Sequence, residues 1–389
     1  MAAVEAGDVS AISEVLKEDS SNRKEEIAAF AISTQGLSAV IASGGGIEAL
    51  PAALSGFLIE EISRAGARAR RLRSTWEETV RALRAAGVEV VALKGAALAF
   101  FHYPDPALRP MGDLDLLLSD PRDIARATEA LASAGWRAIF DTPRHRVFVR
   151  PDERVVRPAA EDADNPIRVE IHTTFRLPVL GRSYDTDATL REEAEVRDLG
   201  GTAVAIAAGS ALLTHLLFHA AGDFAGNGIR GIQAYDFRLL ARAHGALAPE
   251  ISAGRGDRTG ADAPGISSNE KEGSARAPLL FATDAIERLF PLTFEEIFIS
   301  SLASRVRPEL RARASALPAL RYTRPPRGWT RTLLSLIEGP LPKARFVVRT
   351  FFPTLGEVKA NAAPGESGLA LSAAWVRVLA RRIARGLGH

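Results

Sequence analysis

Polar and hydrophobic residues alternate along 113–118, where Asp113 and Asp115 are interleaved with leucines. A period of two predicts a β-strand, because successive side chains of a strand point to opposite faces of the sheet. The two carboxylates therefore share one face, and the leucines pack on the other. Carboxylates held this close repel each other unless a cation lies between them. The pattern is a first indication of a metal site.

A second stretch, 167–173, alternates in the same way and places Arg168, Glu170 and His172 on one face. It is predicted to be another strand of the same small sheet. Continuous or alternating apolar runs predict further short strands over 88–93, 136–140, 146–150 and 154–157.

Apolar residues recur at intervals of three or four in other stretches, which predicts amphipathic helices. The clearest one near the N-terminus, 67–86, is followed by Gly87, a natural helix C-cap. Further helices are predicted over 96–101, from Ser119–Pro121 to about Ser133, over 211–221 and over 232–244.

The order of these elements predicts an α/β (α+β) fold with a small mixed sheet, followed by a helical domain. Two stretches without periodicity, 1–24 and 249–278, are expected to be disordered. The expected divisions are a tail at 1–24, a helical segment at 25–87, an α/β core at 88–207 and a helical domain at 208–389 containing the insertion at about 249–278.

Composition narrows the class of protein. The chain has 389 residues, 47% of them hydrophobic and 25% charged, which is typical of a globular protein with a sizeable core. Its net charge of +2 is the difference between 49 basic and 47 acidic residues and does not favour wholesale nucleic-acid binding. The absence of cysteine excludes disulfides, thiolate nucleophiles and cysteine metal sites.

One uncharged stretch, 199–222, is long enough to cross a bilayer. Its glycines, Thr214, His215 and His219 favour a strand followed by a buried helix. The arginine-rich amphipathic helix expected at 373–389 is interpreted as packing on the domain rather than on a membrane. The N-terminus lacks the basic region and apolar core of a secretion signal. We expect a cytoplasmic protein without stable membrane insertion; a membrane-associated scaffold is the less favoured alternative.

Three motifs carry the candidate chemistry: Leu93-Lys94-Gly95, Arg109-Pro110-Met111-Gly112-Asp113-Leu114-Asp115 and Val169-Glu170-Ile171-His172. In their predicted order of strand, glycine turn, helix and strand, they resemble the polymerase-β-type nucleotidyltransferase superfamily. The resemblance is closer to its uncharacterised bacterial nucleotidyltransferases. It spans roughly residues 50–360 and is most specific in the Lys-Gly and Asp-X-Asp motifs.

This resemblance implies a nucleotidyltransferase domain that transfers a nucleoside monophosphate from an NTP to a hydroxyl or amine. Two divalent ions, Mg²⁺ or Mn²⁺, stabilise the entering and leaving oxygens in such a reaction. No basic stripe with interleaved aromatic residues is visible, so a small-molecule, sugar or peptide acceptor is expected rather than an extended nucleic acid. The alternative is a catalytically degenerate protein of the same fold that binds a nucleotide or a partner.

The resemblance also implies roles for the acidic residues. Asp113, Asp115 and Glu170 are the expected catalytic residues and metal ligands, with Glu170 helping to activate the acceptor hydroxyl. His172 is expected to orient Glu170 or line the pocket.

The expected nucleotide-binding residues are Lys94, Gly95, Ala96 and Arg109. The turn at Gly95 would bring backbone N–H groups to the phosphates, and Lys94 would add a positive charge. Ala96 stands where the superfamily usually has a second glycine or a serine, so a phosphate-binding hydroxyl is missing. Arg109 either clamps a phosphate or braces its loop.

Other polar residues remain undecided from the sequence. His215 and His219 have a helical spacing that suits zinc, but no third ligand is evident, so a packed helix is favoured. Asp223 and Asp236 either contact substrate or cap helices.

Overall fold

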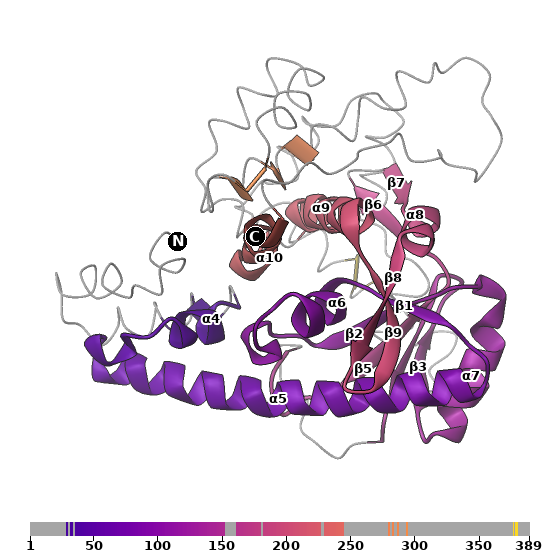
Figure 1. Ribbon diagram of the computed structural model, residues 1–389, viewed down its shortest axis with the longest axis horizontal. Helices are drawn as coiled ribbons and strands as arrows, with labels where there is room; N and C mark the ends of the chain where they lie inside the picture. Colours follow the sequence, from indigo (N-terminus) through magenta and orange to yellow (C-terminus); the bar gives the residue numbers. More distant parts are fainter. Residues whose placement is uncertain are drawn as a thin grey trace.

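The computed structural model describes residues 36–151, 161–179, 182–226 and 229–244, with short runs at 29, 32–33, 279–280, 282–283, 286–287, 293–294, 376 and 378–379. A seven-stranded sheet lies at the centre of the described residues, in the order β3-β4-β5-β2-β1-β9-β8 (Figure 1). Its strands are β1 Val90–Ala92, β2 Asp113–Leu118, β3 Arg137–Asp141, β4 His145–Val149, β5 Arg168–His172, β8 Ala194–Leu199 and β9 Thr202–Ala207. A separate two-stranded sheet is formed by β6 Arg176–Val179 and β7 Arg182–Asp185.

The large sheet is mixed, as the sequence predicts. Strand β2 pairs with β1 antiparallel and with β5 parallel, while β1 also pairs with β9 parallel. The remaining pairs of the sheet are antiparallel. The two strands that carry the acidic residues, β2 and β5, are therefore direct neighbours near the middle of the sheet.

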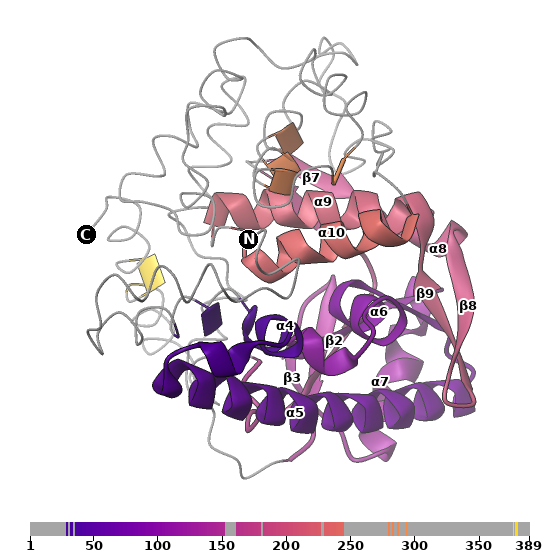
Figure 2. The ribbon, with the colours of Figure 1, turned by 60° about the vertical axis from the view of Figure 1, so that its left-hand side comes forward.

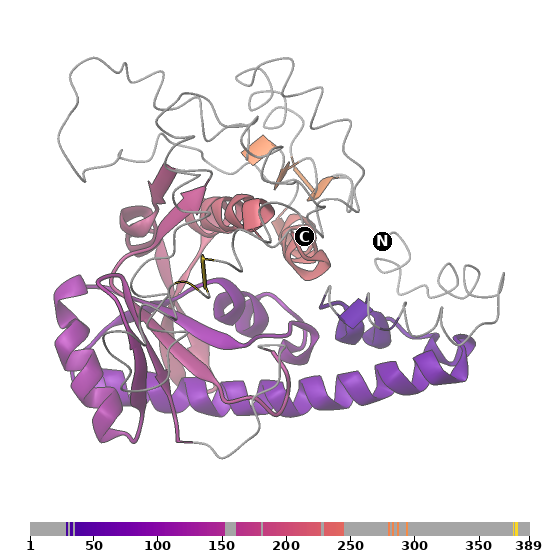
Figure 3. The same ribbon diagram turned by 180° about the vertical axis from the view of Figure 1, so that it is seen from behind.

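Helices cover both sides of the sheet. Figures 1 and 3 show α5 running along one side, with α9 and α10 on the opposite side, and Figure 2 shows α9 and α10 lying next to each other. The helices are α4 Ser38–Ser43, α5 Ala52–Ala85, α6 Lys94–Phe101, α7 Ile124–Ser133, α8 Asp187–Glu192, α9 Gly209–Gly226 and α10 Gly231–His244, with 3-10 turns η1 Ile47–Ala49, η2 Pro106–Leu108 and η3 Pro121–Asp123.

Strand β2 separates two apolar cores because its side chains alternate. Leu114, Leu116 and Leu118 pack with apolar residues of α5 and α7, in one buried cluster. Leu117, on the opposite face, belongs to a second cluster with α9 and α10. Burying each such leucine contributes about 1.5–3 kcal/mol. The alternation predicted from the sequence therefore fixes which face of β2 is left for the carboxylates.

Helix α5 is much longer than the predicted helix over 67–86. It starts directly after Pro51 and continues through Gly56 and Gly66. Each interior glycine costs about 1 kcal/mol relative to alanine. Leu54 and Leu58, which are almost fully buried in the cluster with α9 and α10, offset that cost by tertiary packing.

Several other predicted elements are confirmed. The strands expected over 136–140 and 146–150 are β3 and β4, and 199–222 contains β9 and α9 as interpreted. None of the helices within the described part of the chain is long and apolar enough to cross a membrane. The expected tail at 1–24, the strand at 154–157 and the insertion at 249–278 lie outside the described residues, as does most of the helix at 373–389.

The sequence patterns did not predict β6, β7, α8 or β8. Strand β8 is an exposed edge strand with a charged sequence, AEVRDL, and so has no apolar face that alternation would reveal. The mixed α/β class is confirmed, whereas the expected domain boundaries stay predictions.

Candidate functional site

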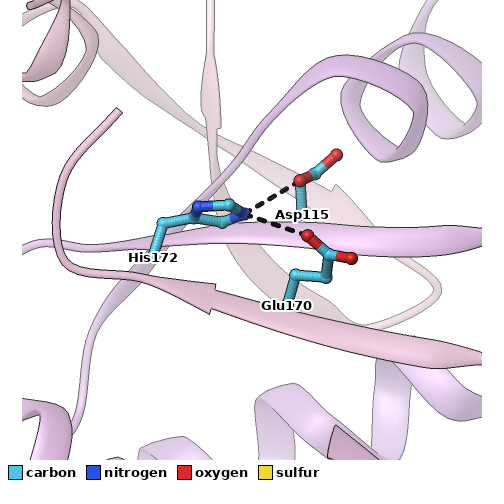
Figure 4. Close-up of side chains that lie close together, drawn as sticks. All are labelled: Asp115, Glu170 and His172. Atoms are coloured by element: carbon cyan, nitrogen blue, oxygen red, sulfur yellow. Dashed lines mark hydrogen bonds and ion pairs between the residues drawn. The ribbon is translucent and has the colours of Figure 1, made fainter. Parts of the chain in front are cut away.

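The pairing of β2 with β5 brings the acidic residues together. Asp115 lies directly opposite Glu170 in the parallel register. Neighbouring strands are about 4.8 Å apart, so side chains on the same face meet. Ligand atoms of Asp115, Glu170 and His172 all lie within 4.8 Å of one another (Figure 4). Among the described residues this is the one group of three such side chains that suits a metal ion.

Asp113 stands next to this group on the same face of β2 and opposite Arg168 of β5. Burial and then the charge of Asp115 raise its pKa to about 6. Asp113 is therefore electrostatically linked to the three clustered side chains, although it does not belong to the compact group itself.

The protonation states show how much negative charge the site holds. Burial, followed by the charges of Asp115 and Asp113, raises the pKa of Glu170 to about 8. Burial also acts to raise the pKa of Asp115, but the ammonium of Lys94 and the hydrogen bond from His172 outweigh it and hold that pKa well below its usual range. Asp115 is ionised near neutral pH, whereas Glu170 retains a proton until the pH approaches 8.

This donor set fits a hard divalent cation. Two carboxylates converge beside the imidazole of His172, and oxygen-rich sites of this kind suit Mg²⁺ and Mn²⁺. A cation would also relieve the repulsion that raises the pKa values of Glu170 and Asp113.

His172 is fixed by contacts on several sides. Its Nε2 lies 2.9 Å from Oδ1 of Asp115 and 3.6 Å from Oε2 of Glu170. Because Asp115 is ionised and can only accept, Nε2 carries the proton and donates. The ring stacks on Phe175 at 4.0 Å and on His145 at 5.1 Å between centroids. Burial lowers the pKa of His172, so the imidazole is neutral at neutral pH.

Lys94 lies on the other side of Asp115. Its Nζ is 3.2 Å from Oδ1 of Asp115 and 4.6 Å from the centroid of the Phe175 ring. Its φ of 45° is the only positive φ of a non-glycine residue in the described part of the chain. Such a left-handed conformation costs a lysine of the order of 1 kcal/mol and persists where surrounding structure imposes it.

The turn after Lys94 is packed tightly. A Cβ atom on Gly95 would lie 2.9 Å from Nη1 of Arg109 and 2.9 Å from Sδ of Met111. Ala96 is buried in the apolar cluster beneath the sheet. A serine hydroxyl at this position would enter an apolar core, which accounts for the alanine.

Arg109 makes the bracing contact that the sequence left open. Its Nε and Nη2 donate to Oδ1 and Oδ2 of Asp236 at 2.9 and 2.8 Å. The hydroxyl of Tyr103 donates to the same carboxylate at 2.7 Å. Asp236 of α10 thereby holds the loop before β2, rather than capping a helix.

The histidines of α9 take separate hydrogen-bonding partners. Nδ1 of His215 lies 3.1 Å from Oγ1 of Thr186, and its ring contacts Phe175 edge-on at 4.9 Å. Nδ1 of His219 lies 3.0 Å from Oδ2 of Asp223. Asp223 also accepts a hydrogen bond from Gln233 of α10.

Two residues important to the site were not predicted. Phe175 touches Lys94, His172 and His215, and no local pattern marks it. Arg68 is 2% exposed and donates to the backbone carbonyls of Met111 and Gly112 just before β2. Its position, four residues before Leu72 on the apolar stripe of α5, is the signal that would have identified a buried arginine.

Comparison with known proteins identifies the family of the chain. A protein-family model described as "Uncharacterised nucleotidyltransferase" matches residues 29–253, which is more than half of the chain and includes every residue of the site. Neither the curated proteins nor the solved structures gave a match. The chain belongs to this family of uncharacterised nucleotidyltransferases and is an enzyme of that class.

Proposed function

We propose that this enzyme transfers a nucleoside monophosphate from an NTP to a hydroxyl or amine of a small-molecule, sugar or peptide acceptor, with Mg²⁺ or Mn²⁺ as cofactor. The observation that carries the proposal is the side-by-side placement of Asp115 and Glu170 on adjacent parallel strands. Together with His172, their ligand atoms lie within 4.8 Å of one another.

Asp115 and Glu170 would hold the metal, with Asp113 and His172 beside them. When bound, divalent cations stabilise the negative charge on the attacking and leaving oxygens of a phosphoryl centre. The raised pKa values of Asp113 and Glu170 support this assignment, because burial and then repulsion between the carboxylates raise them, and a bound cation offsets both effects.

Glu170 would also take the proton of the acceptor hydroxyl on its carboxylate. In the metal-free protein, burial and the neighbouring carboxylates raise the pKa of Glu170 to about 8. A bound cation would lower that pKa, so that the carboxylate is ionised and can accept a proton at neutral pH. His172 donates a hydrogen bond from its Nε2–H to Asp115. Held there, the imidazole would keep the neighbouring carboxylate of Glu170 in place for the proton transfer.

The nucleotide's phosphates would face the first turn of α6, where Lys94 supplies a positive charge and the N–H groups after it point outward. Gly95 and Arg109 would shape this turn by packing against each other. Asp236 holds the side chain of Arg109 in place by two hydrogen bonds. Arg109 would therefore act on the turn from a fixed position.

The direct test incubates the full chain with each radiolabelled NTP, Mg²⁺ or Mn²⁺ and a cell extract, and follows label onto an acceptor. Asp115→Asn is expected to reduce the transfer at least a hundredfold, because it removes charge at the metal site. Asp141→Asn is the matched control, since Asp141 is an exposed aspartate on β3 of the same sheet. Equal label transfer by the Asp115→Asn variant would refute the proposal.

A catalytically degenerate nucleotide-binding protein is the second candidate. It is favoured by the missing hydroxyl at Ala96 and by the engagement of Arg109 with Asp236. The intact Asp113, Asp115 and Glu170 count against it. NTP binding without transfer to any acceptor would favour this candidate.

A further inference from the structure

We propose that Lys94 is a displaceable counter-cation of Asp115. Its ammonium neutralises part of the carboxylate charge in the metal-free enzyme, and a divalent cation must displace it in order to bind. Displacement then frees the ammonium for an anionic ligand such as a triphosphate. This inference rests on the proposed metal-dependent function and adds the order in which the site is filled.

The first argument is the shared oxygen. Nζ of Lys94 and Nε2 of His172 both bond to Oδ1 of Asp115, at 3.2 and 2.9 Å. The same carboxylate belongs to the group suited to a metal. A cation that takes Oδ1 as a ligand competes with Lys94 for that atom, and a cation on either oxygen of this carboxylate is repelled by the ammonium beside it.

The second argument is that the backbone directs Lys94 to this position. The residue before it, Leu93, donates its N–H to the backbone carbonyl of Asp115 at 3.1 Å. Lys94 then adopts a φ of 45°, an unfavourable conformation for a lysine. The fold thus imposes local strain at the residue whose side chain reaches Asp115.

The third argument is that the ammonium of Lys94 neutralises only part of the negative charge of the site. One ammonium faces Asp113, Asp115 and Glu170, and all three carboxyl groups act on Lys94. The site still carries more acidic groups than cations, which leaves an attraction for an added divalent ion. Lys94 therefore weakens the binding of a cation without preventing it.

The fourth argument is that Lys94 has a second partner. Its Nζ lies 4.6 Å from the centre of the Phe175 ring, a cation–π distance. An ammonium that loses Asp115 keeps this contact, so its release does not leave an unpartnered charge in a half-buried site.

The test measures Mn²⁺ binding to the metal-stripped full chain without nucleotide, by calorimetric titration at fixed pH and salt. Lys94→Met keeps the length of the side chain but removes the charge, and we expect it to bind Mn²⁺ roughly tenfold more tightly or better. Lys94→Arg keeps the charge and is expected to stay within about threefold of the unmodified chain. Arg168→Met is the matched control, because this arginine is exposed and lies opposite Asp113 in the strand register; screening by solvent should keep its effect below about twofold.

Thermal unfolding supplies a second readout. In chelator, Lys94→Met should have a lower Tm than the unmodified chain. Saturating Mn²⁺ should raise the Tm of Lys94→Met by more than it raises the Tm of the unmodified chain. If Lys94→Met does not fold, Lys94→Gln takes its place in both measurements.

Unchanged or weaker Mn²⁺ binding by the uncharged variants would overturn the inference, as would the absence of binding in every variant. The absence of Mn²⁺ binding in every variant would also refute the metal dependence of the proposed function. If Lys94→Met binds Mn²⁺ more tightly while the unmodified chain transfers no nucleotide, the inference is supported and the proposed activity is refuted. The two failures are therefore distinguishable.

Discussion

At the scale of single residues, the site is defined by charges that the fold holds too close together. Asp113, Asp115 and Glu170 share one sheet face, and the ammonium of Lys94 is bonded to Asp115. The result is a graded set of protonation states: Asp115 is ionised, Asp113 titrates near pH 6 and Glu170 near pH 8. This gradient makes the metal-free protein sensitive to pH.

We predict that the metal-free protein loses stability as the pH rises from about 5 to 8. The folded-state pKa of Glu170 is raised from 4.5 to about 8, so the folded state binds more protons in this window than the unfolded state. Its contribution is fully present below pH 4.5 and is lost as the pH passes 8. The loss is on the order of 3 kcal/mol.

Urea unfolding in chelator between pH 5 and 8.5 measures this effect. Glu170→Gln, which cannot lose a proton, should flatten the profile, and Mn²⁺ should restore stability at the alkaline end in the unmodified chain. An unchanged pH profile in Glu170→Gln would show that Glu170 is not the group responsible.

At the scale of elements, the start of α6 is a tightly packed junction with an unfavourable backbone conformation. Strand β1 ends at Ala92, Lys94 takes a left-handed conformation, and Gly95 packs directly against Arg109 and Met111. The junction carries both the cation of the site and the turn that is proposed to face the phosphates. A small change in its packing therefore acts on both.

We predict that Gly95→Ala destabilises the protein by about 1–3 kcal/mol, because the added Cβ would lie 2.9 Å from atoms of Arg109 and Met111. Gly56→Ala on α5 is the control, since a Cβ there meets nothing within 4 Å. That control should stabilise the protein by about 0.5–1 kcal/mol through helix propensity. Differential scanning calorimetry of the two variants makes the comparison; equal shifts for both would contradict the packing argument.

At the scale of the whole molecule, α10 is tied to the loop before β2 by a partly buried ion pair between residues far apart in sequence. Asp236 receives two hydrogen bonds from Arg109 and one from Tyr103. Arg109 in turn touches the Gly95 turn. The helices on one side of the sheet thereby hold the loop that leads into β2.

We predict that Asp236→Ala destabilises the protein by about 3–5 kcal/mol, because it leaves the buried guanidinium of Arg109 without its partner. Asp198→Ala, an exposed aspartate in the β8–β9 hairpin, should change stability by less than about 1 kcal/mol. Hydrogen exchange should show lost protection in α10 and around Met111 in the first variant only. Retained protection in both regions would mean that the ion pair does not join them.

The sequence by itself determined the local features of this protein. Alternation along β2 and β5 is a property of neighbouring residues, so it was sufficient to place Asp113, Asp115, Glu170 and His172 on strand faces. The mixed α/β class and the helix after β1 were predictable for the same reason, although that helix begins at Lys94 and already includes Gly95, where a turn was expected. Composition further excluded cysteine chemistry.

Only the tertiary structure decided which of these residues meet and what each one touches. The register that sets Asp115 opposite Glu170, the bond from Lys94 to Asp115, and the placement of Phe175 depend on pairings between distant segments. Arg109 and Asp236 lie 127 residues apart, and no local pattern links them. Strand register and side-chain partners are selected by burial and charge over the whole fold, which is why the sequence predicted a set of carboxylates while the structure determined their neighbours.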